Sequence, residues 1–405
     1  HNSYDDLNDW WAVTVNLDGR LDFSITSLNS QNVYALLYDG DGTTILAGSY
    51  TTTTNTYSED GLAPGTYYIL VKTFYPQEFA PYKLKNNLVL PPNTTESGIP
   101  NDFALNATSI NLNDSINGHI GYRYNGDDDL RDWYKFTTTE DGHIFIKLDV
   151  FNGQNVYAQI FDGDTTTIIT GSYTTTGATY SINGKAAGTY YVRVRNFYDT
   201  EWSPYAIRLN LVPTVPDDPE NNNTPATAVV INPGDSVTGH IGYTYMSYDD
   251  VNDWYQVTTN ADGEIVFKIN SLNSQNVYAE LFDNDGVTEL AGSYTTTTAT
   301  FNKNGLAAGT YFIRIRTFYL SEFAPYDLTV NLIAAPLAND AELNDSVEIA
   351  LPLPVNTSVT GHIGYFYNDY DDLNDYYALT LPVDGKLTVT IDPLLGQYTY
   401  ATLLD

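Results

Sequence analysis

The chain has 405 residues, and its 50 acidic and 17 basic side chains give a formal net charge of -33. This charge argues against nucleic acid and anionic membranes as partners, since both would repel the chain, and a hydrophobic content of 42% argues against a disordered acidic segment. No apolar run reaches the length of a membrane span, and the lack of Cys excludes disulfides and thiolate metal sites.

The sequence is one unit of about 122 residues repeated along the chain. The segment GHIGY recurs at His119, His240 and His362, at spacings of 121 and 122 residues. Polar, Pro-rich stretches separate the copies, and the chain starts and stops within a copy, so we expect a segment of a longer array. The predicted units are 1–90, 91–212, 213–333 and 334–405.

Within one unit the pattern is that of short strands. Apolar and polar residues alternate with a period of two in the ranges 142–150 and 190–197, and pairs such as Asp141-Gly142 suit tight hairpins. No window has a helical period. The sequence therefore predicts an all-β fold, a tandem array of jelly-roll-like β-sandwich domains with eight or nine strands each. Tyr67, Tyr190 and Tyr311, which follow Gly-Thr in each copy, are expected in the core.

An acidic and aromatic motif recurs in each copy, as in DDLRDWY from Asp128. Two of its aspartates lie three residues apart, so a turn brings their carboxylates to one point, and the aromatic residue that follows anchors the turn. Oxygen ligands from a bent loop suit Ca²⁺, whereas Mg²⁺ requires a stricter octahedron. Alternatively, these aspartates accept hydrogen bonds from turn amides without a metal. The pairs are Asp6 and Asp9, Asp129 and Asp132, Asp250 and Asp253, and Asp372 and Asp375.

A second polar element precedes each motif, as in ELNDSVEIA from Glu342. Together with the Asp-x-x-Asp pair and a late Gly-Thr-Tyr strand before Pro-Tyr, it resembles the bacterial pre-peptidase C-terminal domain family, the β-sandwich modules found behind secreted peptidases and collagenases. The resemblance extends over every unit. It implies that linker residues and the Asp-x-x-Asp pair share one Ca²⁺ ion. The implied linker ligands are Asn101 and Asp102, then Glu220, Asn222 and Asn223, then Glu342, Asn344 and Asp345.

Other repeated features have less specific interpretations. The His of GHIGY has no second His or Cys at ligand spacing, so packing or a hydrogen bond is expected rather than zinc. Asp-x-Asp turns such as that at Asp39 are expected to be hairpin turns. Aromatic clusters such as 73–82 and 196–205 indicate contacts between domains or between chains, or a surface that stacks on polymers. Possible glycosylation sites are Asn93, Asn106, Asn113, Asn222, Asn344 and Asn356, and, at Asp-Ser-aliphatic segments, Ser115, Ser236 and Ser346.

The sequence contains no motif of a common enzyme class, and its landmarks recur in every copy rather than once. We therefore expect no enzymatic activity but a structural role, as the stalk of a large extracellular or cell-surface adhesin or filament with linkers rigidified by Ca²⁺. The expected partners are neighbouring copies of the repeat and identical chains. The alternative is a module that binds a polymer, either a collagen-like protein or a polysaccharide, attached to a secreted enzyme.

Overall fold

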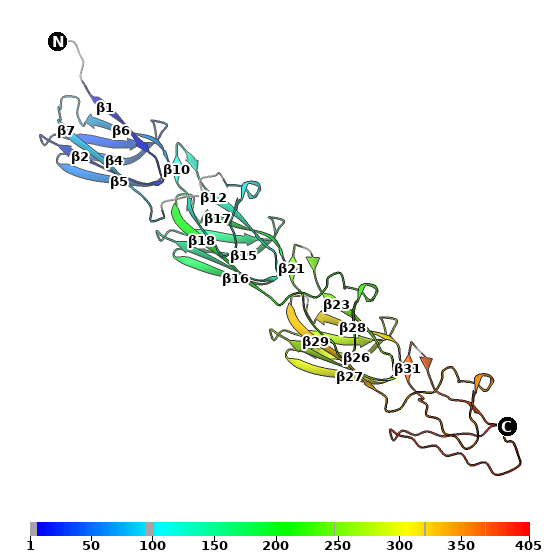
Figure 1. Cartoon of the computed structure of the whole chain (residues 1–405). Helices are drawn as coiled ribbons and strands as arrows, with labels where there is room; N and C mark the ends of the chain where they lie inside the picture. The colour runs from blue at the N-terminus through cyan, green and yellow to red at the C-terminus, as the bar shows by residue number, and fades with distance from the viewer. Residues whose placement is uncertain (1–5, 94–100, 247, 320, 369) are drawn as a thin grey trace.

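The computed structural model of the chain describes residues 6–93, 101–246, 248–319, 321–368 and 370–405. Figure 1 shows the units following one another in a row, from unit 1 at one end to the fourth region at the other. The described residues form strands, short 3-10 turns and loops, with no α-helix among them. None of the described helical turns is long and apolar enough to cross a membrane. The predicted all-β tandem fold is therefore confirmed.

Unit 1 is a sandwich of two sheets with the strand orders β1-β6-β3-β4 and β11-β10-β5-β2-β7. Its own strands are β1 (Asn8–Val15), β2 (Gly19–Ser27), β3 (Val33–Tyr38), β4 (Ile45–Thr51), β5 (Thr54–Leu62), β6 (Gly65–Thr73) and β7 (Tyr82–Val89).

Unit 2 repeats this arrangement with the orders β15-β14-β17-β12-β8 and β22-β21-β16-β13-β18-β9. Its elements are the 3-10 turn η1 (Ala104–Asn106), β8 (Thr108–Ser109), β9 (Ser115–Ile120), β10 (Arg123–Tyr124), β11 (Asp127–Asp128), β12 (Arg131–Thr138), β13 (Gly142–Val150), β14 (Val156–Phe161), β15 (Ile168–Thr174), β16 (Gly177–Lys185), β17 (Gly188–Asn196) and β18 (Ser203–Pro213).

Unit 3 has the orders β19-β23-β28-β25-β26 and β20-β29-β24-β27-β31-β32. Its elements are η2 (Pro225–Thr227), β19 (Val229–Ile231), β20 (Ser236–Ile241), β21 (Thr244–Tyr245), β22 (Tyr248–Asp249), β23 (Asn252–Thr258), β24 (Gly263–Ser271), β25 (Val277–Phe282), β26 (Glu289–Thr295), β27 (Thr298–Leu306), β28 (Thr310–Thr317) and β29 (Ala324–Ala334).

The fourth region, from residue 334 onward, forms little sheet. It contains η3 (Val347–Ile349), β30 (Leu351–Pro352), β31 (Phe366–Tyr367), β32 (Tyr370–Asp371) and β33 (Tyr377–Ala378). Among its described residues β30 pairs with β33, and β31 pairs with β32 in a hairpin that extends a sheet of unit 3. In unit 2, by contrast, β12 pairs with β17, and β13 pairs with β16 and β18.

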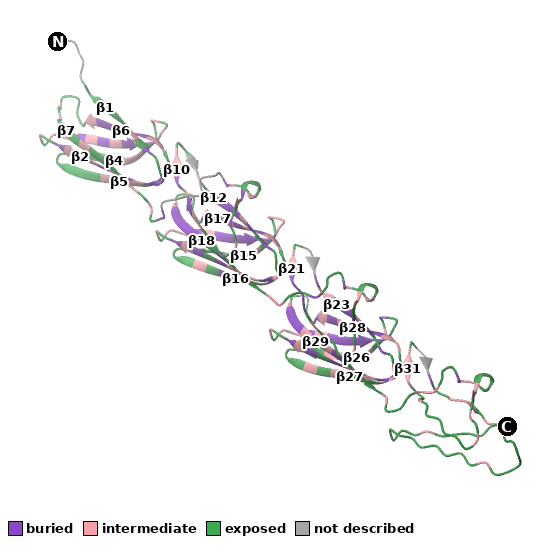
Figure 2. Ribbon diagram, in the orientation of Figure 1, coloured by how far each residue is buried: buried purple, intermediate pink, exposed green. Residues whose placement is uncertain are grey.

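The core lies between the two sheets of each unit. The predicted period of two is confirmed in β13, where Ile144, Ile146 and Leu148 are buried and the residues between them are not. Tyr190 is fully buried as predicted, and its hydroxyl donates to the Ala186 carbonyl at 2.6 Å. Figure 2 shows buried positions along the interior strands of the first three units, and a largely exposed fourth region.

Candidate metal centre and interdomain joint

Successive units are joined by a short hairpin that crosses to the preceding unit. Strands β21 and β22, from unit 3, extend the second sheet of unit 2 through a parallel pairing of Thr244 with Lys185. The hairpin of unit 2 pairs with unit 1 in the same way, Arg123 with Leu62, and β31 pairs with unit 3, Phe366 with Leu306. Each of the first three units therefore completes one sheet with residues that belong to its successor.

A tyrosine at the tip of each hairpin enters the preceding unit. Tyr245 packs against the core of unit 2, and its ring lies 5.4 Å from that of Tyr190 in an edge-on contact. A Cβ atom added at Gly163 would lie 2.2 Å from the Tyr245 hydroxyl oxygen, and one added at Gly188 would lie 2.4 Å from the Tyr245 ring. The glycine of the Gly-Thr-Tyr motif is therefore required by close approach of a side chain from the next unit. Tyr124 and Tyr367 occupy the equivalent places in units 1 and 3.

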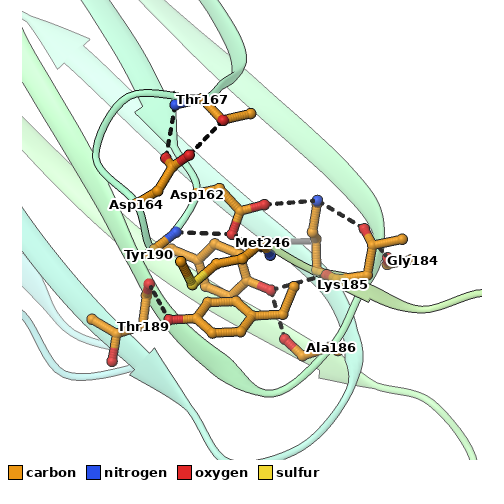
Figure 3. A network of polar contacts seen from close by, with 12 residues as sticks. Asp162, Asp164, Thr167, Gly184, Lys185, Ala186, Thr189, Tyr190 and Met246 are labelled. Carbon is orange, nitrogen blue, oxygen red and sulfur yellow. Dashed lines mark hydrogen bonds and ion pairs between the residues drawn. The ribbon is translucent and has the colours of Figure 1, made fainter. Parts of the chain in front are cut away.

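We call the site that receives the tyrosine the socket; in unit 2 it is formed by Gly163, Gly188 and Tyr190. Polar groups hold the hairpin in the socket, as Figure 3 shows for unit 2. The buried Asp162 carboxylate accepts a hydrogen bond from the Met246 amide at 3.0 Å, and the Lys185 ammonium lies 3.7 Å from the same carboxylate. The Lys185 ammonium also donates to the Thr244 hydroxyl at 3.0 Å. Asp39 and Asp283 accept the equivalent amides of residues 125 and 368 in the other two sockets. The predicted hairpin turns that contain these aspartates therefore also bind the hairpin of the next unit through hydrogen bonds.

The histidine of GHIGY adds a further contact across each joint. His119 is buried, and its Nδ1 lies 2.8 Å from Asp18 of unit 1 while its Nε2 lies 2.8 Å from the Asn93 carbonyl. His362 makes the equivalent contact with Asp262 at 2.8 Å. His240 lies 3.5 Å from Asp141 and 2.5 Å from Asp217. His119 and His362 therefore join units by hydrogen bonds, which agrees with the expected role, and His240 faces Asp141 of the preceding unit.

A cluster of carboxylates lies at the base of the hairpin between units 2 and 3. Oxygens of Glu220, Asp250 and Asp253 lie within 4.8 Å of one another, and so do those of Asp217, Asp218 and Glu220. The Gly242 amide donates to the Asp250 carbonyl at 2.5 Å, which closes the base of the hairpin. The linker is fixed beside it because the Trp254 amide donates to the Asn222 carbonyl at 2.9 Å. Linker, hairpin and strand β23 thus converge on one point.

Several buried oxygens of this cluster lack hydrogen-bond donors among the described residues. Both carboxylate oxygens of Asp250, one of Asp253 and the side-chain oxygen of Asn222 are buried without a hydrogen-bond partner among the described residues. The other Asp253 oxygen accepts from the Tyr326 hydroxyl at 2.5 Å, which fixes that carboxylate. Burying acceptor oxygens without donors costs free energy, and a positively charged group placed among these oxygens would offset that cost. This donor set of oxygens fits Ca²⁺.

The electrostatics of the ion-free cluster point the same way. Burial, followed by repulsion from Asp217 and Asp218, raises the pKa of Asp250 to about 7. Burial also raises the pKa of Glu220 to about 8 and that of Asp218 to about 6. The pKa of Asp253 is raised well above its usual value, again chiefly by burial. The cluster therefore resists carrying its full negative charge unless a cation is bound.

The joint that leads into the fourth region has a smaller version of the cluster. Oxygens of Asp340, Glu342 and Asp375 lie within 4.8 Å of one another. Both oxygens of Asp372 and the side-chain oxygen of Asn344 are buried without a hydrogen-bond partner among the residues described. The Tyr376 amide donates to the Asn344 carbonyl at 2.8 Å, as in the previous joint. Burial raises the pKa of Asp372 to about 7 and that of Asp375 to about 6.

The joint between units 1 and 2 is only partly described, since residues 94–100 lie outside the described residues. Asn101 is buried, and its carbonyl accepts from the Trp133 amide at 2.8 Å. Burial, then repulsion from Asp102, raises the pKa of Asp129 to about 7, and Asp132 is buried and accepts from the Tyr205 hydroxyl.

The predicted ligands of unit 1 lie in a more open setting. Asp6 is exposed, and Asp9 is half-buried and accepts from the Tyr82 hydroxyl at 2.7 Å.

Most of the predicted ligands of the second and third joints come together, with two differences. Asn223 makes no side-chain hydrogen bond in the described part of the chain, and Asp345 acts on the cluster only through its charge, which contributes to the raised pKa of Asp372. Three cluster members were not predicted: Asp217, Asp218 and Asp340. A signal was present, because Asp218 and Asp340 both open the pattern Asp-x-Glu-x-Asn.

The predicted glycosylation sites divide by exposure. The amide nitrogens of Asn93, Asn222 and Asn344 are buried and donate to the Tyr205 carbonyl, Asp218 and Asp340, so a glycan there would displace these hydrogen bonds. Ser346 is half-buried. The exposed predicted sites are Asn106, Asn113, Asn356, Ser115 and Ser236.

No family model and no curated protein sequence matches the chain. Among solved structures it is similar to the pre-peptidase C-terminal domain of collagenase from Bacillus anthracis, at 18% identity over 29% of this chain and 99% of that chain, with a TM-score of 0.21. It is also similar to tripeptidyl peptidase 2, at 9% identity over 82% of this chain and 34% of that chain, with a TM-score of 0.21.

A third similar structure is the CBM22-1–CBM22-2 tandem domain of Paenibacillus barcinonensis Xyn10C, at 8% identity over 55% of this chain and 91% of that chain, with a TM-score of 0.17. The first of these three structures is a domain of the family that the linker and Asp-x-x-Asp motifs resemble.

Proposed function

We propose that the chain is a structural repeat region, the stalk of an extracellular or cell-surface protein whose joints are stiffened by Ca²⁺. One observation carries this proposal. At two successive joints, carboxylate and amide oxygens are buried together, next to the docked hairpin, without hydrogen donors among the described residues. A divalent cation supplies the missing positive charge.

The ligands would come from the three segments that meet at the joint. Between units 2 and 3 they are the linker residues Asp217, Asp218, Glu220 and Asn222 together with Asp250 and Asp253. A bound cation would offset part of the charge of these carboxylates and connect the linker to the base of the hairpin. Since the same hairpin is inserted in the preceding unit, a cation here would reduce the angular freedom of two neighbouring units.

An extracellular setting agrees with this ligand chemistry, because extracellular modules bind Ca²⁺ at about 10⁻⁴ to 10⁻³ M. The repetition of socket and cluster agrees with a structural role rather than catalysis, because the same feature recurs at successive joints. Immunolabelling of intact cells with an antibody against this chain tests the location.

A calcium titration of the full chain tests the function. We expect Ca²⁺ to raise the melting temperature and to narrow the distribution of maximum dimensions in small-angle X-ray scattering, and EDTA to reverse both changes. Mg²⁺ at the same concentration is the control ion. Asp250→Asn should remove part of the response, and Asp392→Asn, at an exposed site outside the joints, should keep it. Identical melting and scattering curves in Ca²⁺ and EDTA would reject the proposal.

A further inference from the structure

Each of the first three units carries an ordered platform of exposed aromatic rings on the outer face of its first sheet. In unit 2, Tyr173 on β15 lies directly across from Tyr157 on β14, and Tyr157 lies across from Arg195 on β17. The Arg195 guanidinium lies over the Tyr157 ring, 4.7 Å from its centre. Phe197 and Tyr198 follow β17, and the Phe197 ring contacts those of Tyr173 and Tyr198.

The same residue types occupy the same register in the other two units. Tyr, Tyr and a basic residue lie side by side on three neighbouring strands, and a Phe-Tyr pair follows the last of them. We call each set an aromatic platform. The platform of unit 1 is Tyr50, Tyr34, Lys72, Phe74 and Tyr75, and that of unit 3 is Tyr294, Tyr278, Arg316, Phe318 and Tyr319.

The rings are exposed although their positions are fixed. Tyr173 is 60% exposed and Tyr198 is 57% exposed. The loop after β17 is held because the Tyr198 amide donates to Glu201 at 3.1 Å and Asn155 donates to the same carboxylate at 3.0 Å. Such fixed aromatic surfaces lose little conformational entropy on binding. Packing between neighbouring strands explains why the edges of the rings are buried. It does not explain why an exposed Phe-Tyr pair occurs at the same place in three units.

The chemistry of the platform selects a ligand class. The ring faces offer apolar contact, and the hydroxyls of Tyr157, Tyr173 and Tyr198 make no hydrogen bond within the described part of the chain. Two of the three cations are already engaged: Arg195 also donates to the Asn196 carbonyl at 3.1 Å, and Arg316 pairs with Glu280 at 3.1 Å. A matching ligand has flat C–H faces and hydroxyl groups and needs no counter-ion, which describes a sugar ring.

The charge of the chain narrows the choice further. At a net charge of -33, an anionic polymer or a second copy packed side by side would be repelled, whereas a neutral polymer is not. We therefore propose that the aromatic platforms bind a neutral polysaccharide. Because the units follow one another in a row with the same arrangement (Figure 1), one extended polymer can contact more than one platform, and the weak sites then act together.

Native affinity electrophoresis of the full chain tests this proposal. The probes are gels that contain a mixed-linkage β-glucan, galactomannan or dextran, with alginate as the anionic polymer. We expect retardation in at least one neutral gel and none in alginate. The variant Tyr173→Ala/Tyr198→Ala should bind several-fold more weakly, and adding Tyr294→Ala/Tyr319→Ala should lower the apparent affinity about 10-fold or more, since multivalency is lost.

Phe103→Ala is the matched control, because Phe103 is a 64% exposed aromatic residue outside the platforms, and it should bind like the parent. Circular dichroism and melting curves establish that each variant is folded. The test is run in Ca²⁺ and in EDTA, so that its outcome is separate from that of the calcium titration. No retardation in any neutral gel, equal retardation in alginate, or unchanged binding by the four-site variant would overturn the proposal. So would binding of a proline-rich peptide, or self-association in sedimentation, that the same substitutions abolish.

Discussion

The sockets and the carboxylate clusters lie at the same joints but differ in how uniformly they are built. The socket has the same parts three times: a tyrosine, a glycine that makes room for it and an aspartate that accepts the tip amide. The cluster varies, from five carboxylates between units 2 and 3 to a set around Asp340, Glu342 and Asp375 at the next joint. The docking of the hairpin is therefore the same at each of these three joints, whereas the response of a joint to cations can differ from one joint to the next.

The largest effect is expected from removing a tyrosine from its socket. Tyr245→Ala leaves a gap in unit 2 although the substitution lies in unit 3, and it should lower the free energy of unfolding of unit 2 by about 2 to 4 kcal/mol. Hydrogen exchange measured peptide by peptide should show the loss of protection in β16 and β17. An effect confined to unit 3 would contradict the docking described above.

Glycine variants sharpen this prediction. Gly188→Ala should reproduce the loss, because the new methyl group would meet the Tyr245 ring. Gly385→Ala is the control, since no atom lies within 4 Å of the added Cβ. Equal melting curves for the two variants would show that the space in the socket is not limiting.

The next effect concerns the differences among clusters. At a Ca²⁺ concentration about 100 times the dissociation constant, binding stabilises a folded domain by about 2.7 kcal/mol. Asp250→Asn should remove this gain for unit 3, and Asp372→Asn should leave unit 3 unchanged. Isothermal titration calorimetry of the parent should resolve more than one class of site. A single class, lost entirely in either variant, would show that the clusters act as one site.

The pH dependence tests the same clusters without a mutation. Burial raises the pKa of Asp250 to about 7 in the ion-free chain, above its unfolded value near 4. The folded state therefore holds the extra proton, and the stabilisation is present at pH 4 and is lost as the pH rises through 7. Calorimetry in EDTA should show stability falling from pH 5 to 8, and the gain from Ca²⁺ growing over the same range. A gain independent of pH would argue against these carboxylates as ligands.

The smallest effect is expected at the histidine. His119→Gln removes the contact with Asp18 and should cost about 1 kcal/mol, limited to the joint between units 1 and 2. His143→Gln is the control, because His143 lies on the outer face of unit 2 and contacts Ser181 and Phe145 of the same unit. Chemical denaturation measures both variants. A larger loss for His143→Gln would contradict the role of His119 in the joint.

The sequence was sufficient for the sandwich and its core, because alternation places Tyr190 and the apolar residues of β13 on the inner face. The spacing of three in a turn predicted that Asp250 and Asp253 converge, and the family resemblance placed Glu220 beside them, and these three residues do lie together. The sequence did not identify Asp218 and Asp340, whose place depends on how the linker folds back over the next unit.

The crossing of the hairpin was beyond reach of sequence patterns for a related reason. Strands β21 and β22 have two residues each, too few for a periodic signal, and the register of β21 on Lys185 is set by the socket. The glycine of Gly-Thr-Tyr was visible in each copy, but its reason lies in Tyr245, more than fifty residues away along the chain. Contacts between units leave repeated residues in the sequence without showing what those residues touch.

The direction in which the hairpins cross gives the array a polarity in time as well as in space. A ribosome makes unit 2 before the hairpin at Thr244–Asp249 exists, so the fold of unit 2 is finished by residues synthesised after its own last strand ends at Pro213. Until then Gly163 and Gly188 border an unfilled hollow. Folding of such a chain is therefore completed in order from the N-terminal side, because each newly synthesised unit supplies the hairpin that completes the unit before it.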